Sequence, residues 1–176
     1  MHSNRIKLVK PDLELIPQVR AAVLESRAEL EKYLGWVQNS LDNPESNMQL
    51  AITNHEMQAN ELRYYIFQCQ PALLVGTIGL IVRDRAVPFF EIGYWVRTSQ
   101  TGRGFVTEAV GLLESYAFLE LHANRLEIRM AKCNLRSRAV AENSGYQLEA
   151  ELLNERRLPS GALSNTLVYA KCDLGI

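Results

Sequence analysis

The chain has 176 residues, of which 47% are hydrophobic, and its formal net charge is −1. This length and composition suit one soluble domain spanning residues 1–176, and the near-zero charge excludes a general attraction to nucleic acid. No segment has the roughly 18 apolar residues of a membrane span and the N-terminus lacks a signal-peptide pattern, so we expect a cytoplasmic protein.

Helical patterns dominate the first third of the chain. A short strand at about 5–10 is followed by helical spacing over 13–33, with Pro17 in the first turn. The segment 43–46 (Asn-Pro-Glu-Ser) is typical of a turn and cap, and it predicts a second helix that ends near Asn60.

Strand patterns dominate the rest of the chain, where runs of β-branched, aromatic or alternating apolar residues predict about six further strands. They span about 63–68, 74–82, 89–96, 125–131, 146–156 and 166–172. Two helices are predicted at 104–120 and 135–144, with Gly145 ending the second. Because helix 104–120 crosses between its flanking strands, those two strands are expected to be parallel. The expected fold is an α/β domain with a mixed sheet of about seven mostly antiparallel strands, a central parallel pair and about four helices.

A glycine-flanked turn, with Gly102 and Gly104, joins the strand that ends at Val96 to the next helix. Glycine has no side chain, so the backbone N–H groups of 102–105 can converge on an anion at the partly positive helix N-terminus. Arg103 can add a charge-assisted contact. The turn is therefore a candidate phosphate cradle, and a tight turn without a ligand is the alternative.

This turn differs from the two best-known glycine-rich phosphate loops. It has no Gly-Lys-Ser/Thr ending, which excludes a P-loop. A dinucleotide fingerprint would need a third glycine or alanine where Thr107 stands, and its strand should begin a βαβ unit. A Rossmann interpretation is therefore weak.

The cysteines and histidines are scattered along the chain. Cys69, Cys133 and Cys172 show no CxxC spacing, so neither a disulfide framework nor a zinc site is indicated, and they fit a reducing compartment. Cys133 is interpreted as a small buried side chain rather than as a nucleophile. We expect no metal and assign no catalytic role to the histidines.

Four segments in a fixed order carry a family resemblance that covers nearly the whole chain. They are 5–11, 91–96, 101–109 and 134–146. Together they resemble the GCN5-related N-acetyltransferases (GNAT), specifically the branch with the ribosomal-protein N-terminal acetyltransferases (Rim type). Each segment alone would be modest evidence.

The sequence departs from the family pattern at three positions. Thr101 stands where the family usually has Gln or Arg, and Val106 where it has Ala or Gly, but neither change removes a backbone N–H. Ala141 stands where many members carry a tyrosine that acts as a general acid. The Rim-type branch commonly lacks this tyrosine too, and the serine that matches Ser137, three residues after Asn134, is its proposed substitute.

The resemblance implies acetyl-CoA as cosubstrate, bound without a metal between the splayed strands 89–96 and 125–131. The pantetheine arm would pair with the backbone of the first strand, the pyrophosphate would lie in the cradle, and Asn134 with Ser137 would hold the thiol arm. The implied cofactor-binding residues are Tyr94, Trp95, Val96, Thr101, Gly102, Arg103, Gly104, Phe105, Val106, Thr107, Asn134 and Ser137. For Asn134 the structural alternative is a helix N-cap.

The implied reaction is direct acetyl transfer to an amine, which needs a base, an oxyanion donor and an acid. A backbone N–H near Tyr94 or Trp95 would polarise the thioester carbonyl. Glu91 is the candidate base, directly or through water, because it is the one acid in an apolar strand; a solvent-facing edge residue or a salt bridge to a neighbouring arginine is the alternative. Ser137 would protonate the leaving thiolate, and its alternative role is to satisfy helix N–H groups.

An α-amino group has a pKa of about 7.7–8.0, against about 10.4 for lysine, so a modest base suits the former. The acceptor favoured is therefore the N-terminal α-amino group of a protein such as a ribosomal protein. Small-molecule amines stay open, as does a catalytically silent CoA-binding sensor. Trp36 would lie on the acceptor side in the Rim-type branch, and helix packing is its alternative role.

Local basic residues and the last hairpin leave further alternatives open. Five basic residues flank the two motifs: Arg97, Arg103, Lys132, Arg136 and Arg138. They indicate either contacts to the phosphates of CoA or an ordinary solvated face, and a nucleic-acid-binding or ribosome-bound module is disfavoured by the overall charge. Val168 and Tyr169 are placed on a potential edge strand that would serve a homodimer.

Overall fold

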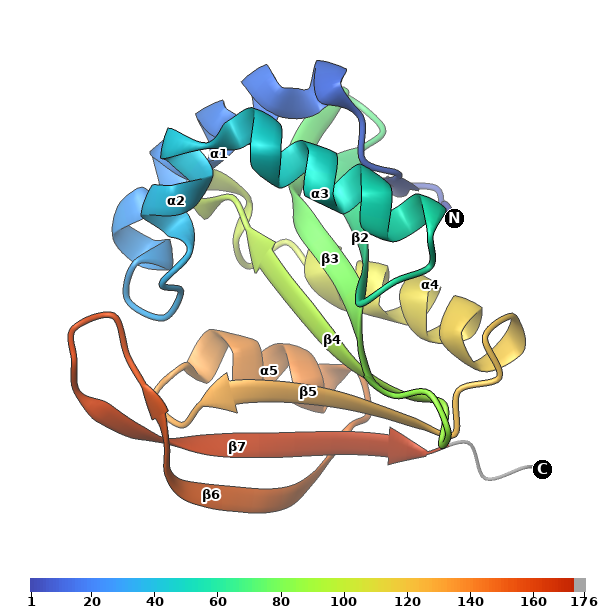
Figure 1. Cartoon of the computed structure of the whole chain (residues 1–176), viewed down its shortest axis with the longest axis vertical. Coiled ribbons are helices and arrows are strands. Elements are labelled where there is room, and N and C mark those ends of the chain that lie inside the picture. Colours follow the sequence, from blue (N-terminus) through green and yellow to red (C-terminus); the bar gives the residue numbers. More distant parts are fainter. Residues whose placement is uncertain (173–176) are drawn as a thin grey trace.

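The computed structural model describes residues 1–172, and its sheet has the strand order β1-β2-β3-β4-β5-β7-β6 (Figure 1). The strands are β1 (Ile6–Val9), β2 (Glu61–Gln68), β3 (Leu73–Asp84), β4 (Phe89–Val96), β5 (Arg125–Ala131), β6 (Gln147–Arg157) and β7 (Leu163–Cys172). The helices are α1 (Ile16–Leu30), α2 (Val37–Asp42), α3 (Pro44–Glu56), α4 (Phe105–Leu119) and α5 (Leu135–Asn143), with 3-10 turns η1 (Leu13–Leu15) and η2 (Thr98–Gln100). Within the described chain, no helix has the length and apolarity needed to cross a membrane.

The predicted mixed sheet is confirmed, with β4 and β5 as its parallel pair and antiparallel pairing elsewhere. One detail was wrong: the strand with Val168 and Tyr169 is not an edge. It lies between β5 and β6, and both side chains are buried. The edge is β6, because the last hairpin folds so that β7 hydrogen-bonds on both sides.

The helices before β2 differ from the prediction. The single helix expected over 13–33 is a 3-10 turn followed by α1, and Pro17 lies in the first turn of α1 as expected. The short helix α2 was not predicted, because it has six residues and buries only Val37. It stays separate from α3 because Pro44 has no N–H and forces Asn43 out of the helical region, to φ −129° and ψ 54°.

Strands β4 and β5 are paired at one end only. Their register runs from Phe89 opposite Arg125 to Glu91 opposite Glu127 and then stops. Beyond that point β4 continues along β3 and β5 continues along β7, so the two strands diverge as Figure 1 shows. The predicted splayed pair is therefore confirmed.

Apolar side chains fill both faces of the sheet. On one face α4 packs Val110 and Leu113 against strand residues such as Ile128. On the other face α1, α2 and α3 form a second cluster that includes Val23 and Trp95. The apolar residues that recur at helical spacing in the sequence of α4 are thus the ones on its buried side. The splayed strands lie between the two helical layers.

At Gly76 the backbone of β3 lies very close to that of β4. A Cβ atom there would lie 2.1 Å from the carbonyl oxygen of Trp95, a distance that no real contact allows. Gly93, on the partner strand, would place its Cβ at an ordinary 3.5 Å from Ile81 Cδ1. The backbone of β4 at the splay is therefore positioned by the absence of a side chain at residue 76.

Gly76→Ala should lower the free energy of unfolding by about 2–4 kcal/mol, because β3 must move away from β4. Gly93→Ala is the matched control and should change it by less than about 1 kcal/mol. Urea denaturation followed by circular dichroism measures both. Equal effects of the two substitutions would contradict this account of the strand contact.

Candidate functional site

The turn between β4 and α4 presents a row of free backbone amides. Gly102 and Gly104 adopt φ of 73° and 77°, and Gly104 is the N-cap residue of α4. The first helical hydrogen bond runs from the Glu108 N–H to the Gly104 carbonyl at 3.0 Å. Within residues 1–172, the amides of 102–107 therefore have no acceptor. A Cβ atom on Gly102 would meet nothing within 4 Å, so the turn is open on that side.

Helix α1 fixes the start of this turn. The Thr98 N–H donates to Ser26 Oγ at 2.9 Å, and the Ser99 N–H donates to Glu25 Oε1 at 3.1 Å. Both acceptors come from a helix more than seventy residues earlier in the chain. The segment between β4 and the cradle is thus held by contacts with α1, in addition to the turn formed by Gly102 and Gly104.

The five basic residues near the two motifs all have protein partners. Arg103 donates to Gln100 Oε1 at 2.6 Å rather than pointing away from its own turn. The other four form ion pairs: Arg97 with Glu25, Lys132 with Glu151, Arg136 with Glu29, and Arg138 with Glu142. These pairs agree with the solvated-face alternative, and contacts of these side chains to the phosphates of CoA stay a prediction.

A cleft follows the splay between β4 and β5 and consists of two cavities. The α1 cavity, of about 410 Å³, reaches from α1 and α3 across the sheet face to Glu91. The α5 cavity, of about 390 Å³, extends from the end of β4 to α5. Six residues line both: Tyr33, Leu34, Tyr94, Trp95, Asn134 and Ser137. The cavities therefore meet where β4 and β5 part.

The alternation of β4 determines which of its amides face this cleft. The Arg97 N–H, just after β4, donates to the Val75 carbonyl of β3 at 2.7 Å. Successive residues of a strand point their N–H groups to opposite sides, so Trp95 faces β3 as well, whereas Tyr94 and Val96 face the opened side. Because β5 has left β4 at this point, the N–H of Tyr94 is directed into the splay.

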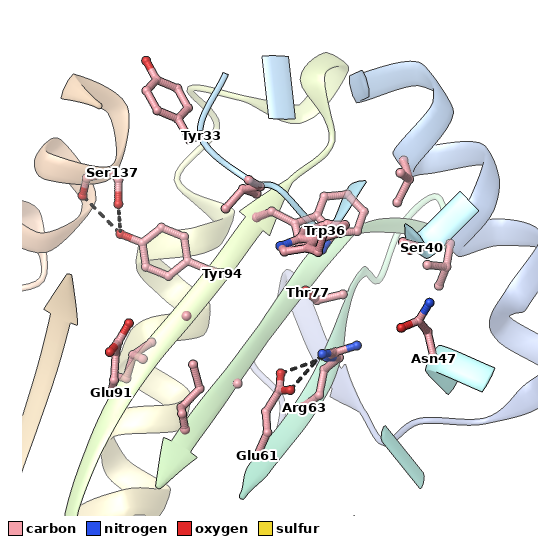
Figure 2. A pocket seen from close by; sticks show the side chains of 18 of the residues that line it. Tyr33, Trp36, Ser40, Asn47, Glu61, Arg63, Thr77, Glu91, Tyr94 and Ser137 are labelled. Carbon is pink, nitrogen blue, oxygen red and sulfur yellow. Dashed lines mark hydrogen bonds and ion pairs between the residues drawn. The ribbon is translucent and has the colours of Figure 1, made fainter. Parts of the chain in front are cut away.

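Tyr94 also joins the two sides of the cleft through its side chain, as Figure 2 shows. Its hydroxyl donates to the Ser137 carbonyl at 3.1 Å and lies 3.0 Å from Ser137 Oγ. Burial raises the pKa of this hydroxyl above its ordinary range, so it keeps its proton. Sequence reasoning predicted only the backbone of Tyr94, because nothing local links it to a serine 43 positions later.

Asn134 begins α5 as an N-cap residue. Its Oδ1 accepts a hydrogen bond from the Ser137 N–H at 3.2 Å, which is the structural role considered from the sequence. The cap places Ser137 in the first turn of α5, at the junction of the two cavities. Asn134 and Ser137 therefore both line the cleft, in addition to their roles in the helix cap.

Glu91 is 8% exposed and lines the α1 cavity, with its carboxylate beside β4 in Figure 2. Arg83 Nε donates to its Oε2 at 2.9 Å, and a second guanidinium nitrogen pairs with the same oxygen. Within residues 1–172, Oε1 accepts no hydrogen bond from any side chain or amide. The salt-bridge alternative is therefore present, and it leaves one carboxylate oxygen for a further donor.

The remaining lining of the α1 cavity combines aromatic and polar groups. Trp36 and Trp95 pack with ring centres 6.1 Å apart, and both line the cavity. Arg63 forms a two-bond pair with Glu61, at 2.9 and 2.8 Å, on the cavity floor (Figure 2). Trp36 thus packs against a core aromatic and faces the cavity at once.

The expectation that Cys133 is buried was wrong. Its side chain is exposed and lines the α5 cavity, because the chain leaves β5 after Ala131 and turns into α5. The described residues contain no group of three or more His, Cys, Asp or Glu side chains placed to hold a metal ion.

Alkaline pH should destabilise the fold through three tyrosines, of which Tyr64 and Tyr146 are buried and Tyr94 is partly buried. Burial is the main cause that raises the pKa of Tyr64, Tyr94 and Tyr146 above the ordinary 10.0. The unfolded chain loses these protons near pH 10 while the folded chain keeps them, so their contribution to stability is complete below that pH and falls as pH rises. We expect the urea midpoint to drop between about pH 9 and about pH 11.

Tyr94→Phe removes one of the three groups and should make that drop smaller. It should also lower stability at neutral pH by about 1 kcal/mol, through loss of the hydrogen bonds to Ser137. A drop as large as in the unmodified chain would show that Tyr94 does not contribute to the pH dependence.

Residues 5–147 match the family model described as Acetyltransferase (GNAT) domain. Probable N-acetyltransferase YjcK of Bacillus subtilis is 37% identical over 91 residues, which are 51% of this chain and 50% of that protein. The chain spans about half the length of the curated relatives it matches.

The solved structures that share the fold include two acetyltransferases with bound ligands. One is RimL, a ribosomal L7/L12 alpha-N-protein acetyltransferase in complex with coenzyme A, with TM-score 0.87, 24% identity and coverage of 97% of this chain and 95% of that chain. The other is the Microcin C7 self immunity acetyltransferase MccE in complex with acetyl-CoA and AMP, with TM-score 0.85, 22% identity and coverage of 97% and 94%. At these identities the likeness concerns the fold.

Proposed function

Since this chain belongs to the GNAT family of acetyltransferases, we propose that it transfers the acetyl group of acetyl-CoA to a primary amine. The observation that carries the proposal is one path through the molecule. It runs from the free amides of 102–107, along the opened edge of β4, to the unpaired oxygen of Glu91. Such a path suits a long donor with an anionic end and a reactive end.

We propose that the donor binds along the first part of this path. Its pyrophosphate accepts hydrogen bonds from the amides of 102–107 at the N-terminus of α4. Its pantetheine arm occupies the α5 cavity, where the backbone groups of Tyr94 and Val96 lack a neighbouring strand and can pair with amides of the arm. The thioester then lies near Ser137, where the two cavities meet.

The reaction we propose is direct attack of the amine nitrogen on the thioester carbonyl carbon. As the C–N bond forms, the Tyr94 N–H stabilises the negative charge on the carbonyl oxygen. Glu91 accepts the proton of the attacking amine through Oε1, directly or by a water. When the C–S bond breaks, Ser137 supplies a proton to the thiolate, and its hydroxyl lies beside that of Tyr94 at 3.0 Å. Solvent water in the cleft then returns a proton to Ser137 and takes the proton from Glu91.

For the acceptor, we propose the N-terminal α-amino group of a protein such as a ribosomal protein. The α-amino group is partly neutral at working pH and needs less help from a base than lysine does. The likeness to RimL supports this choice. A small-molecule amine is the second candidate, because the α1 cavity of about 410 Å³ is large enough for a whole small molecule.

Gly104→Val should weaken CoA binding by about 100-fold, because valine is strained at the φ of 77° that Gly104 adopts and the turn must rearrange, which displaces its amides. Gly161→Val is the matched control, since Gly161 also has positive φ, 87°, but lies in the turn of the last hairpin. Isothermal titration with CoA measures both. Wild-type affinity in the Gly104 variant would contradict the proposed donor site.

Glu91→Gln should lower kcat by about 10²- to 10⁴-fold while leaving CoA affinity unchanged, because only proton removal from the acceptor is lost. Release of free CoA thiol with peptide and small-amine acceptors gives the rate. Arg83→Gln keeps the carboxylate but loses the ion pair that orients it, so it should lower kcat by less than Glu91→Gln does. If Glu91→Gln is fully active on every acceptor that the unmodified protein uses, another group is the base.

A further inference from the structure

A single guanidinium connects the N-terminal segment to the turn that forms the cradle. Arg5 Nη2 donates to the Arg103 carbonyl oxygen at 3.2 Å, and Arg5 Nε donates to Glu108 Oε2 at 2.8 Å. The guanidinium carbon also lies 5.0 Å from the centre of the Phe105 ring. Arg5 thus contacts the backbone of the turn, the first residue of α4 and a carboxylate one turn along α4.

The contact to the carbonyl of Arg103 has a consequence for the next amide. In a planar trans peptide, the C=O of one residue and the N–H of the next point in opposite directions. Since Arg5 holds the Arg103 carbonyl, the N–H of Gly104 must point away from Arg5. That N–H has no acceptor within residues 1–172.

A glycine turn needs such a restraint. Gly102 and Gly104 have no Cβ, so the peptide planes between them can rotate at little cost, and a rotated plane would present a carbonyl where the cradle needs an N–H. An anion would then meet a partial negative charge. A hydrogen bond from a charged donor at the outer side of the Arg103 peptide opposes this rotation.

The second contact concerns charge. Glu108 lies in the first turn of α4, next to the amides that an anion would approach, and its carboxylate alone would repel that anion. Arg5 pairs with Oε2, and Ser3 Oγ hydrogen-bonds Oε1. The same guanidinium therefore orients an amide donor and offsets the negative charge of Glu108 in the first turn of α4.

We propose that Arg5 is a positioning residue of the donor site, which holds the Gly104 N–H toward the pyrophosphate and neutralises Glu108 beside it. This inference rests on the proposed function, because it takes acetyl-CoA as the donor. Arg5 acts from the side of the turn opposite the Gly104 amide and does not touch the reacting atoms.

The test is the affinity of the full chain for CoA, measured by isothermal titration. Arg5→Ala should raise Kd at least about tenfold, because one charge-assisted restraint and one charge compensation are lost. Arg5→Lys should recover only part of the loss, since one ammonium cannot reproduce the two directions of the guanidinium fork. Arg27→Ala is the matched control, with a similarly exposed side chain paired to Glu31, and should stay within about twofold.

Two further measurements separate this role from simple destabilisation. The ¹⁵N–¹H signal of Gly104 in the unliganded protein should shift in Arg5→Ala and not in Arg27→Ala. In acetyl transfer, Arg5→Ala should raise KM for acetyl-CoA with kcat unchanged, and should not alter kcat/KM for S-acetyl-N-acetylcysteamine, a thioester without a pyrophosphate.

Wild-type CoA affinity in Arg5→Ala, or equal losses with both thioesters, would overturn the inference. Full recovery in Arg5→Lys would overturn the orienting role. If the unmodified chain binds CoA but acetylates no amine, the proposed reaction fails while the titrations still decide the role of Arg5.

Discussion

The structure depends on one constraint: the polar backbone groups of β4 must be satisfied although β5 leaves β4 after Glu91. A strand in the middle of a sheet normally bonds on both sides, and orphaned amides and carbonyls in a cleft are costly. Here β3 holds one side of β4 along its whole length, helped by the close approach at Gly76. The other side of β4 has no neighbouring strand beyond Glu91, and we propose that the amide groups of the donor pair with it.

The two helical layers make the two ends of this opened edge chemically different. One end of the cleft meets the N-terminus of α4, where backbone dipoles and free amides attract an anion. The other end reaches Glu91 and the cavity under α1 and α3. Between these two ends, Tyr94 of β4 hydrogen-bonds Ser137 of α5. These direct hydrogen bonds connect the two sides of the cleft.

The charged side chains discussed above, around the cleft, are held in pairs with protein groups. The basic side chains near the cradle are paired with acids or with Gln100, whereas the backbone amides of the turn are free and their positions are set by the fold. Arg83 holds one oxygen of Glu91 and orients the other. Preorganised dipoles and a fixed carboxylate need little rearrangement when a reaction begins, which is the property that acyl transfer requires.

The sequence by itself determined the order of elements from β2 onward, the parallel crossover through α4 and the glycine turn, because these follow from local periodicity and from the conformational freedom of Gly102 and Gly104. Only the tertiary structure decided the contacts between distant segments, such as Tyr94 with Ser137, Arg83 with Glu91 and Arg5 with the cradle. It also showed that Cys133 is exposed and that β7 is an inner strand. Burial and pairing depend on which strand lies beside which, and no local pattern records that.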